Sequence, residues 1–292
     1  MTDRLIVDVG MHRGDDTDFY LRKGFRVVAI EADPRLTAEA ELRFSAAIAE
    51  GRLVVLNVAV AEEPGEVDFY ASSIEGWGSI RAERAGSALG ADVERLRVPS
   101  DTFAGLLSPF PVPYYVKVDI EGADRLCIES LCGMEHRPEL VSFEADVSDP
   151  TGTEDLIELL SQSGYRDFKL VNQALNPSVR CPFPALEGRY VDARFTHEMS
   201  GPFGREAPGE WQRAEAISQR LIEIGRQQRA RATYAESGRI LGLPLGRFHR
   251  QVKAVYNLPP VVAVRQRYAQ ARGRDMGGWF DVHARLGSVE TE

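Results

Sequence analysis

The sequence predicts an α/β protein: a doubly wound, Rossmann-like sheet of seven mostly parallel strands, followed by an α-helical C-terminal extension. Over residues 5–59, bulky apolar runs alternate with helical spacing, and a run such as Leu5–Val9 fits a strand buried on both faces. Beyond about residue 200, Arg-rich helical spacing replaces these runs. We therefore expect a domain at 1–200 and a basic extension at 201–292 that serves the substrate pocket, a lid or an oligomer contact.

The first three strands and the two helices between them follow from signals at their ends. Asp15–Thr17 offer capping side chains to a first helix, which Gly24 closes. Asp33 and Pro34 open a second helix that runs to about Ala49. The three strands around these helices are expected at Leu5–Val9, Arg26–Glu31 and Arg52–Ala59.

The middle of the chain departs from this alternation and then returns to it. Glu66–Ala71 alternates polar and apolar residues, which predicts an antiparallel strand, and residues 72–95 indicate a long loop with a short helix. Further helices are expected at Thr102–Leu107, Ala123–Leu131 and Glu154–Ser163. Four more core strands are expected at Tyr114–Ile120, Leu140–Glu144, Tyr165–Val171 and, as the seventh, Tyr190–Phe195.

Charge is divided unevenly along the chain. Residues 1–204 carry 20 basic and 35 acidic side chains, whereas residues 205–285 carry 15 basic and seven acidic ones. The basic segment is expected to form a helix at 210–229 and two or three short helices within 230–274. It could dock on the acidic domain, attract an anionic substrate, or contact nucleic acid or anionic lipid. The net charge of −9 and the lack of a basic stripe interleaved with aromatic residues argue against nucleic acid.

The composition narrows the class of protein further. Hydrophobic residues make up 43% of the chain, but no apolar stretch reaches the ~20 residues of a membrane span. Because the start of the chain leads directly into a strand, without a signal-peptide pattern, we expect a cytoplasmic protein. Three sparse cysteines fit a reducing compartment. The sequence leaves a homodimer open.

A glycine turn follows the first predicted strand, with the spacing Asp8-x-Gly10-x-x-x-Gly14. Gly10 can adopt a positive φ and lets a ligand approach the backbone. A dinucleotide-binding turn instead has Gly-x-Gly-x-x-Gly, and the acids Asp15 and Asp16 disfavour phosphate while favouring an ammonium or sulfonium cation. The turn therefore argues against a nicotinamide-dependent oxidoreductase, although a turn without a ligand can also hold two glycines.

Two further motifs stand at predicted strand ends. Glu31 ends the second strand, where a carboxylate can accept hydrogen bonds from both hydroxyls of a ribose, and a solvated charge is the alternative. The segment 117–122 (KVDIEG) ends the fourth strand and places Asp119 and Glu121 on one face, toward the ligand crevice. An ion pair with Lys117, or a helix cap, is the alternative for these carboxylates.

These motifs together resemble the FkbM family of S-adenosylmethionine-dependent methyltransferases. The turn at 65–67 (GEV) and the segment 142–144 (SFE) are also similar to that family, and the resemblance covers about residues 5–170. It implies a class I methyltransferase fold and methyl transfer from S-adenosyl-L-methionine to a hydroxyl of a sugar, polyketide or other secondary metabolite. The pair His12-Arg13 and the long segment beyond residue 200 depart from the family pattern.

The resemblance also implies roles for particular residues. The cofactor-binding residues would be Asp8, Gly10, Gly14, Thr17, Glu31, Asn57, Ala59 and Asp119, and His12 joins them by its place in the turn. An alcohol acceptor must lose its proton, so a nearby base is expected. The candidate catalytic residues are Asp119, Glu121, Glu144 and His197. No metal ligand is assigned, because the sequence has no dense ligand motif.

Three alternatives remain open at this point. The acceptor could be a nitrogen or a carboxylate instead of a hydroxyl of a small molecule. The protein could bind an adenosyl compound or a partner without catalysis. Residues 279–283, which include Trp279 and His283, could cover the substrate mouth or pack in the core as a C-terminal strand.

Overall fold

A seven-stranded sheet forms the centre of the protein, in the order β3-β2-β1-β7-β8-β12-β9. The computed structural model describes residues 3–72, 79–80, 93–120, 122–147, 150–236, 239–240, 243–244 and 278–287. The strands of this sheet are β1 (Leu5–Val9), β2 (Arg26–Glu31), β3 (Leu53–Asn57), β7 (Tyr115–Val118), β8 (Leu140–Ala145), β9 (Tyr165–Asn172) and β12 (Phe280–Leu286). β12 is antiparallel to both β8 and β9, and the other neighbours are parallel. The predicted mostly parallel, seven-stranded sheet is confirmed.

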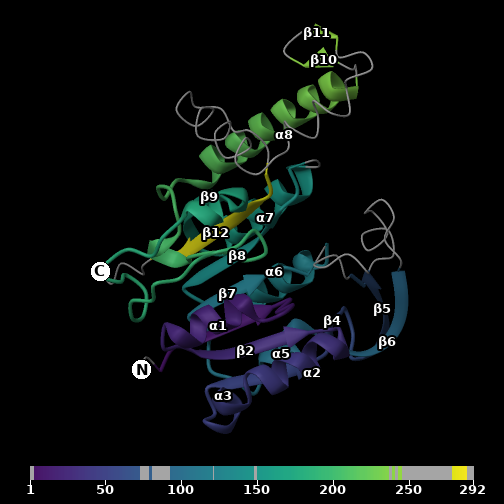
Figure 1. Ribbon diagram of the computed structural model, residues 1–292, viewed down its shortest axis with the longest axis vertical. Coiled ribbons are helices and arrows are strands. Elements are labelled where there is room, and N and C mark those ends of the chain that lie inside the picture. The colour runs from purple at the N-terminus through teal and green to yellow at the C-terminus, as the bar shows by residue number, and fades with distance from the viewer. Residues whose placement is uncertain are drawn as a thin grey trace.

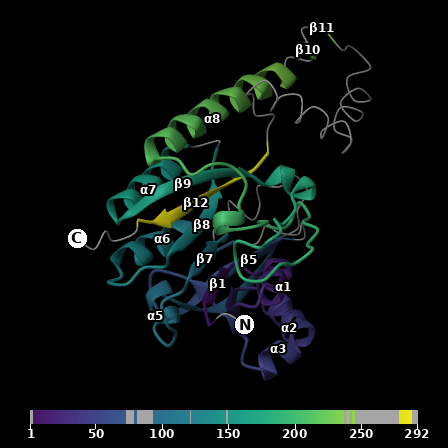
Figure 2. The same ribbon diagram turned by 90° about the vertical axis from the view of Figure 1, so that its left-hand side faces the viewer.

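Helices cover both faces of this sheet, as Figure 2 shows. The helices on one face are α1 (Asp15–Arg22), α2 (Pro34–Arg43) and α3 (Ser45–Ala49). Those on the other face are α5 (Phe103–Leu107), α6 (Asp124–Gly133), α7 (Pro150–Gln162) and α8 (Ala214–Glu236). Successive strand residues face opposite sides, so Ile6 packs in the core on the side of α1, and Val7 packs in the core on the side of α6 and α7. None of the described helices is both long enough and apolar enough to cross a membrane.

The helix expected from Asp33 to Ala49 is two helices in the structure. Asp33 caps α2 as predicted, since its carboxylate accepts a hydrogen bond from the Arg35 amide at 2.9 Å. Phe44 separates α2 from α3 with φ −106° and ψ 17°. Its ring packs on Gly14, where an added Cβ would lie 2.6 Å from the ring. The break therefore places an aromatic ring against the glycine turn.

The prediction of Tyr190–Phe195 as the seventh strand is wrong. Val191, Ala193 and Phe195 are buried, but the segment pairs with no strand in the described part of the sheet. The seventh strand is β12, which lies in yellow between β8 and β9 in Figure 1. The boundary expected at residue 200 therefore does not enclose the sheet, because the segment 201–292 supplies one of its inner strands.

A smaller sheet of three strands, in the order β4-β6-β5, stands beside the third strand. The predicted strand Arg52–Ala59 divides at Val58 into β3 and β4 (Ala59–Val60), which belong to different sheets. β5 (Gly65–Ser72) is antiparallel to β6 (Val93–Asp101), as its alternating pattern predicts. The start of β6 falls in the segment that we expected to be a loop, and most of the expected short helix lies outside the described residues.

An irregular segment, residues 173–212, covers the part of the sheet face beside α1 on which the structure describes no α-helix. It contains the short 3-10 helices η1 (Gln173–Ser178) and η2 (Gly204–Glu206). The ring of Phe203 stacks on Tyr115 of β7 with the ring centroids 4.5 Å apart. The helix expected at 210–229 is α8, and between α8 and residue 278 the structure describes only the hairpin of β10 (Arg239–Ile240) and β11 (Leu243–Pro244).

Candidate active site

A cavity of about 810 Å³ opens at the carboxyl ends of the strands, where an open α/β sheet binds its ligands. Its volume lies within the ~300–1,000 Å³ typical of small-molecule sites. Seven predicted site residues line it: Gly10, His12, Glu31, Ala59, Asp119, Glu144 and His197. Glu121 lies outside the described residues. The remaining four, Asp8, Gly14, Thr17 and Asn57, surround the cavity wall without lining it.

The glycine turn is clamped between two neighbouring strands. Gly10 has φ 81°, and a Cβ added there would lie 1.8 Å from the backbone oxygen of Asp119. Its amide donates to the Ile30 carbonyl at 2.9 Å. Gly10 is therefore needed for the close approach of two backbones as well as for access to the cavity. Gly14 has φ 79° and packs on Phe44 outside the cavity.

The carboxylate of Glu31 is fixed at the end of β2. Its Oε2 accepts from the His12 amide and its Oε1 from the Asp33 amide, both at 2.8 Å. The side chain lines the cavity although the residue is only 7% exposed. Burial raises the pKa of Glu31 to about 7. Each carboxylate oxygen retains a lone pair for a further donor, so Glu31 can accept two hydrogen bonds from a ligand.

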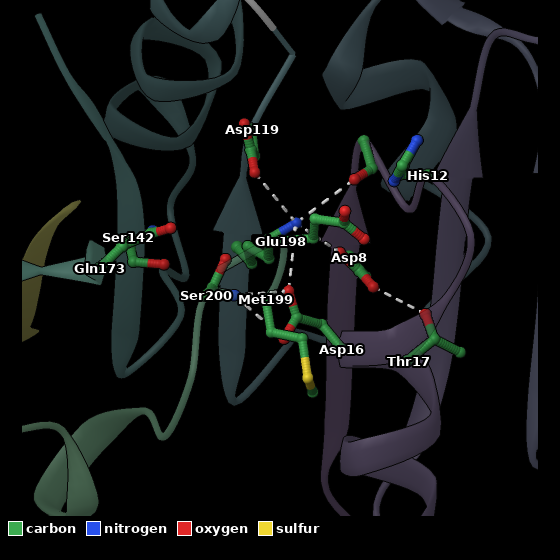
Figure 3. Close-up of polar contacts among 12 residues, drawn as sticks. Asp8, His12, Asp16, Thr17, Asp119, Ser142, Gln173, Glu198, Met199 and Ser200 are labelled. Atoms are coloured by element: carbon green, nitrogen blue, oxygen red, sulfur yellow. Dashed lines mark hydrogen bonds and ion pairs between the residues drawn. The ribbon is translucent and has the colours of Figure 1, made fainter. Parts of the chain in front are cut away.

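The carboxylates of Asp8 on β1, Asp16 on α1 and Asp119 after β7 come together in Figure 3. Lys117, which also lines the cavity, lies among them. Its Nζ is 3.3 Å from Asp8 Oδ1, 3.5 Å from Asp119 Oδ2 and 3.7 Å from Asp16 Oδ2. Burial opposes its charge, but the three carboxylates outweigh burial and hold the pKa of Lys117 well above its usual value. The ion pair that we weighed as an alternative for Asp119 is therefore present, and Asp119 also reaches the cavity.

Three predicted residues support the cavity from behind. The hydroxyl of Thr17 donates to Asp8 at 2.7 Å, and both residues are fully buried. Asn57 donates to the backbone carbonyls of Glu31 and Ala32 at 3.0 and 3.2 Å. These contacts hold the ends of β1 and β2 in place, and none of the three residues lines the cavity itself.

Asp16 lines the cavity and was missed among the predicted site residues. Its carboxylate accepts from the Ser200 amide at 3.0 Å, which ties α1 to the segment 173–212. Burial raises the pKa of Asp16 to about 6. Its place directly after the glycine turn is the signal in the sequence, from which we expected a helix cap and a charge that favours a cation, but not a site residue.

The far wall of the cavity comes from β8, β12 and the segment after β9. Glu144 lies opposite Asp281 in the register of β8 with β12, and both line the cavity. The rings of His197 and Trp279 are 6.1 Å apart and also line it, together with Gln173. The sequence pattern did not single out Asp281 or Gln173. Trp279 and Asp281 thus line the cavity, whereas Phe280 and His283 are buried in β12, as the alternative of a core strand predicts.

The candidate bases Asp119, Glu144 and His197 therefore share one cavity. Their place at strand ends predicts this for Asp119 and Glu144, whereas His197 reaches the cavity from the irregular segment 173–212. Among the described residues, no group of three His, Cys, Asp or Glu side chains could hold a metal ion. The sequence profile of the Methyltransferase FkbM domain matches residues 8–166, which is more than half of the chain. The chain belongs to the FkbM methyltransferase family.

Solved structures similar to this FkbM chain show low identity. A methyltransferase FkbM from Methylobacillus flagellatus KT is 16% identical with a TM-score of 0.38, and the match covers 57% of this chain and 39% of that one. A precorrin-6y C5,15-methyltransferase from Geobacter metallireducens GS-15 is 14% identical, with a TM-score of 0.35 over 58% of this chain and 67% of that one.

A SAM-dependent methyltransferase from Thiobacillus denitrificans, in complex with S-adenosyl-L-homocysteine, is 10% identical with a TM-score of 0.33. That match covers 98% of this FkbM chain and 86% of the other. The chain thus spans well under half of the Methylobacillus protein and most of the Thiobacillus one. A comparison with curated proteins gives no match.

Proposed function

We propose that this FkbM protein binds S-adenosyl-L-methionine and transfers its methyl group to a hydroxyl of a small molecule. The observation that carries the proposal is the Glu31 carboxylate, which two backbone amides hold in the cavity wall. A ribose with two free hydroxyls supplies the donors that this carboxylate lacks.

The three cysteines, none of them in a disulfide, support a cytoplasmic location.

The rest of the cavity suits the two ends of this cofactor. Apolar side chains of Val58, Phe69 and Ile80 line the cavity near Ala59 and would pack on the adenine. The carboxylates of Asp16 and Asp119 lie on the opposite side of Glu31, where the ammonium and sulfonium charges would be stabilised. These carboxylates would repel the phosphates of a dinucleotide, which disfavours the alternative of a nicotinamide-dependent oxidoreductase.

The chemistry requires alignment and one proton transfer. As the acceptor oxygen forms its bond to the methyl carbon, the carbon–sulfur bond breaks and its electron pair stays on sulfur. Holding the three atoms in line supplies most of the acceleration, and a positioned base contributes typically 10²–10⁴-fold. Asp119 follows β7, Glu144 lies at the end of the neighbouring strand β8, and His197 lines the same cavity, so each of them can reach an acceptor hydroxyl.

The first prediction concerns Glu31. The variant Glu31→Ala should bind S-adenosylhomocysteine about 100-fold more weakly in calorimetry, because two charge-assisted hydrogen bonds are lost. Glu41→Ala on the exposed side of α2 is the matched control and should bind like the wild type. Equal affinities for the two variants would remove Glu31 from the ribose role and, with it, the main support for this cofactor.

The acceptor class needs a separate experiment. Labelled S-adenosylmethionine is incubated with small alcohols, sugars, amines and carboxylic acids, and transfer to the hydroxyl compounds is expected. Transfer only to amines or acids would change the acceptor, whereas cofactor binding with no transfer to any compound would favour a non-catalytic binding protein. Titration with a nicotinamide dinucleotide tests the oxidoreductase alternative and should show no binding.

A further inference from the structure

The late strand β12 brings a buried acid to the cavity. Asp281 is the second residue of β12 and is only 4% exposed, yet it lines the cavity beside Glu144 of β8. Lys117 lies beside Ser142 and Ser142 beside His283 in the register. Two residues nearer the cavity, Asp119, Glu144 and Asp281 therefore fall level with one another on the same face of the sheet. The acid therefore faces the half of the cavity that lies beyond the proposed cofactor.

A fixed amide holds this acid. Trp279 donates its indole N–H to Gln173 Oε1 at 3.1 Å, and the backbone N–H of Gln173 donates to the backbone carbonyl of Trp279 at 3.0 Å. An indole nitrogen can only donate, so it fixes the orientation of the Gln173 carboxamide. The Gln173 side chain can then donate only through Nε2, and it hydrogen-bonds Asp281. One neutral donor thus orients the carboxyl group.

The charges around Asp281 come from several elements. Asp119 and Asp16 repel its ionised form, and Lys117 attracts it, although that cation is shared with Asp8. Glu144 stands directly across the strand pair. Burial is the largest influence and, with Asp119, raises the pKa of Asp281 well above its usual value. A sulfonium in the cavity would reverse this balance, because a nearby cation favours a carboxylate.

We propose that Asp281 is the general base of the methyl transfer, with Gln173 and Trp279 as its positioning residues. This inference rests on the proposed function. The acceptor hydroxyl gives its proton to Asp281 as its oxygen bonds to the methyl carbon, and the broken carbon–sulfur bond leaves its electron pair on a neutral thioether. The sulfonium and the Asp281 carboxylate lose their opposite charges in the same step, so the transfer leaves the net charge of the cavity unchanged.

The primary test measures protons and needs no acceptor. Binding of S-adenosylmethionine and of S-adenosylhomocysteine is followed by calorimetry at pH 7 in buffers of different ionisation enthalpy. Wild-type protein should release more protons with the sulfonium compound than with the thioether, because only the sulfonium favours ionised Asp281. This difference should become much smaller in Asp281→Asn, where only Glu31 and Asp16 still respond to the sulfonium, and it should be unchanged in Asp167→Asn, a matched change on β9 away from the cavity. An undiminished difference in Asp281→Asn would overturn the proposal.

A second test measures the rate of methyl transfer to whichever compound the acceptor experiment identifies. Asp281→Asn should lower kcat about 10²–10³-fold while the affinity for S-adenosylhomocysteine stays within about threefold of wild type. A kcat within about threefold of wild type would assign the base to Asp119, Glu144 or His197 instead. Failure of the wild type to bind S-adenosylmethionine would be a different result, since it would contradict the proposed function itself.

The positioning residues have their own readout. The hydrogen bond from Gln173 favours ionised Asp281, so Gln173→Leu should raise the pKa of this acid further and move the acidic limb of the kcat–pH profile to higher pH. Trp279→Phe keeps a ring but loses the donor, and it should shift the limb in the same direction by less. A uniform drop in kcat without a shift of this limb would mean that both residues act only through folding.

Discussion

Single buried acids make the stability of the protein depend on pH in an unusual direction. Burial raises the pKa of Glu31 to about 7 and that of Asp16 to about 6, whereas an unfolded chain has ordinary carboxyl pKa values. At a pH between the ordinary pKa of the unfolded chain and the raised pKa of the folded protein, the folded state binds more protons than the unfolded state. The free energy of unfolding contributed by these groups is therefore present at low pH and is lost as pH rises through the folded-state pKa.

Glu31→Gln should remove most of this dependence. Urea unfolding at pH 5 and pH 8 should show the wild type losing about 2–3 kcal/mol more than the variant over this range, because the pKa of Glu31 rises from 4.5 to about 7. Glu41→Gln is the control and should follow the wild type. The same pH slope in wild type and Glu31→Gln would show that Glu31 ionises normally in the folded protein.

At the same scale, the sequence predicts a site residue well when its position depends on its own strand. Glu31, Asp119 and Glu144 each stand at a strand end, and the rule for open α/β sheets places them at the cavity. Asp281 and Gln173 could not be found in this way. Their place depends on which strands pair with β12, and no local pattern contains that pairing.

At the scale of secondary-structure elements, a local pattern likewise does not show which segment joins the sheet. Residues 190–195 (YVDARF) and residues 281–286 (DVHARL) have nearly the same alternation of polar and apolar residues. Only the second forms a strand of the sheet, between β8 and β9. The sequence thus predicts the parallel strands, which are apolar on both faces, more reliably than the antiparallel one. The buried polar residues of β12, such as Asp281 and His283, give this antiparallel strand the sequence pattern of a surface strand.

Hydrogen exchange should distinguish β12 from an ordinary chain end. The last residues of a domain usually exchange fast, but both edges of β12 are paired and Val282 is fully buried. Amides of the peptide 280–286 should therefore exchange as slowly as those of β1. Exchange within seconds at β12, together with slow exchange at β1, would show that β12 leaves the sheet easily.

Over the whole molecule, the segment 173–212 joins the two halves of the sheet. It contacts α1 through Ser200 and Asp16, and it contacts β9 through Lys169, which donates to the Ala207 carbonyl at 2.6 Å. A fully buried ion pair between Lys23 and Glu206, 2.8 Å apart, connects it to the end of α1. The cavity is thus bordered by a segment that is fixed at several points and does not depend on regular helix packing.

Breaking this ion pair should be costly. Lys23→Met leaves the Glu206 carboxylate buried without its cation and should lower the free energy of unfolding in urea by about 3–5 kcal/mol. The double variant Lys23→Met with Glu206→Gln should recover most of that loss. Arg22→Met, which breaks an exposed pair with Asp18, should cost less than about 1 kcal/mol. Equal losses in the two single variants would contradict a special role for the buried pair.

The position of β12 in the sheet has a consequence for biosynthesis. A ribosome makes β8 and β9 long before it reaches residues 280–286, and chain growth proceeds at roughly 5–20 residues per second. For several seconds, the nascent chain therefore presents two unpaired strand edges with a gap between them, and such edges recruit other chains. A protein with this strand order has to be shielded by a chaperone, or keep β9 unfolded, until translation has delivered the strand that separates them.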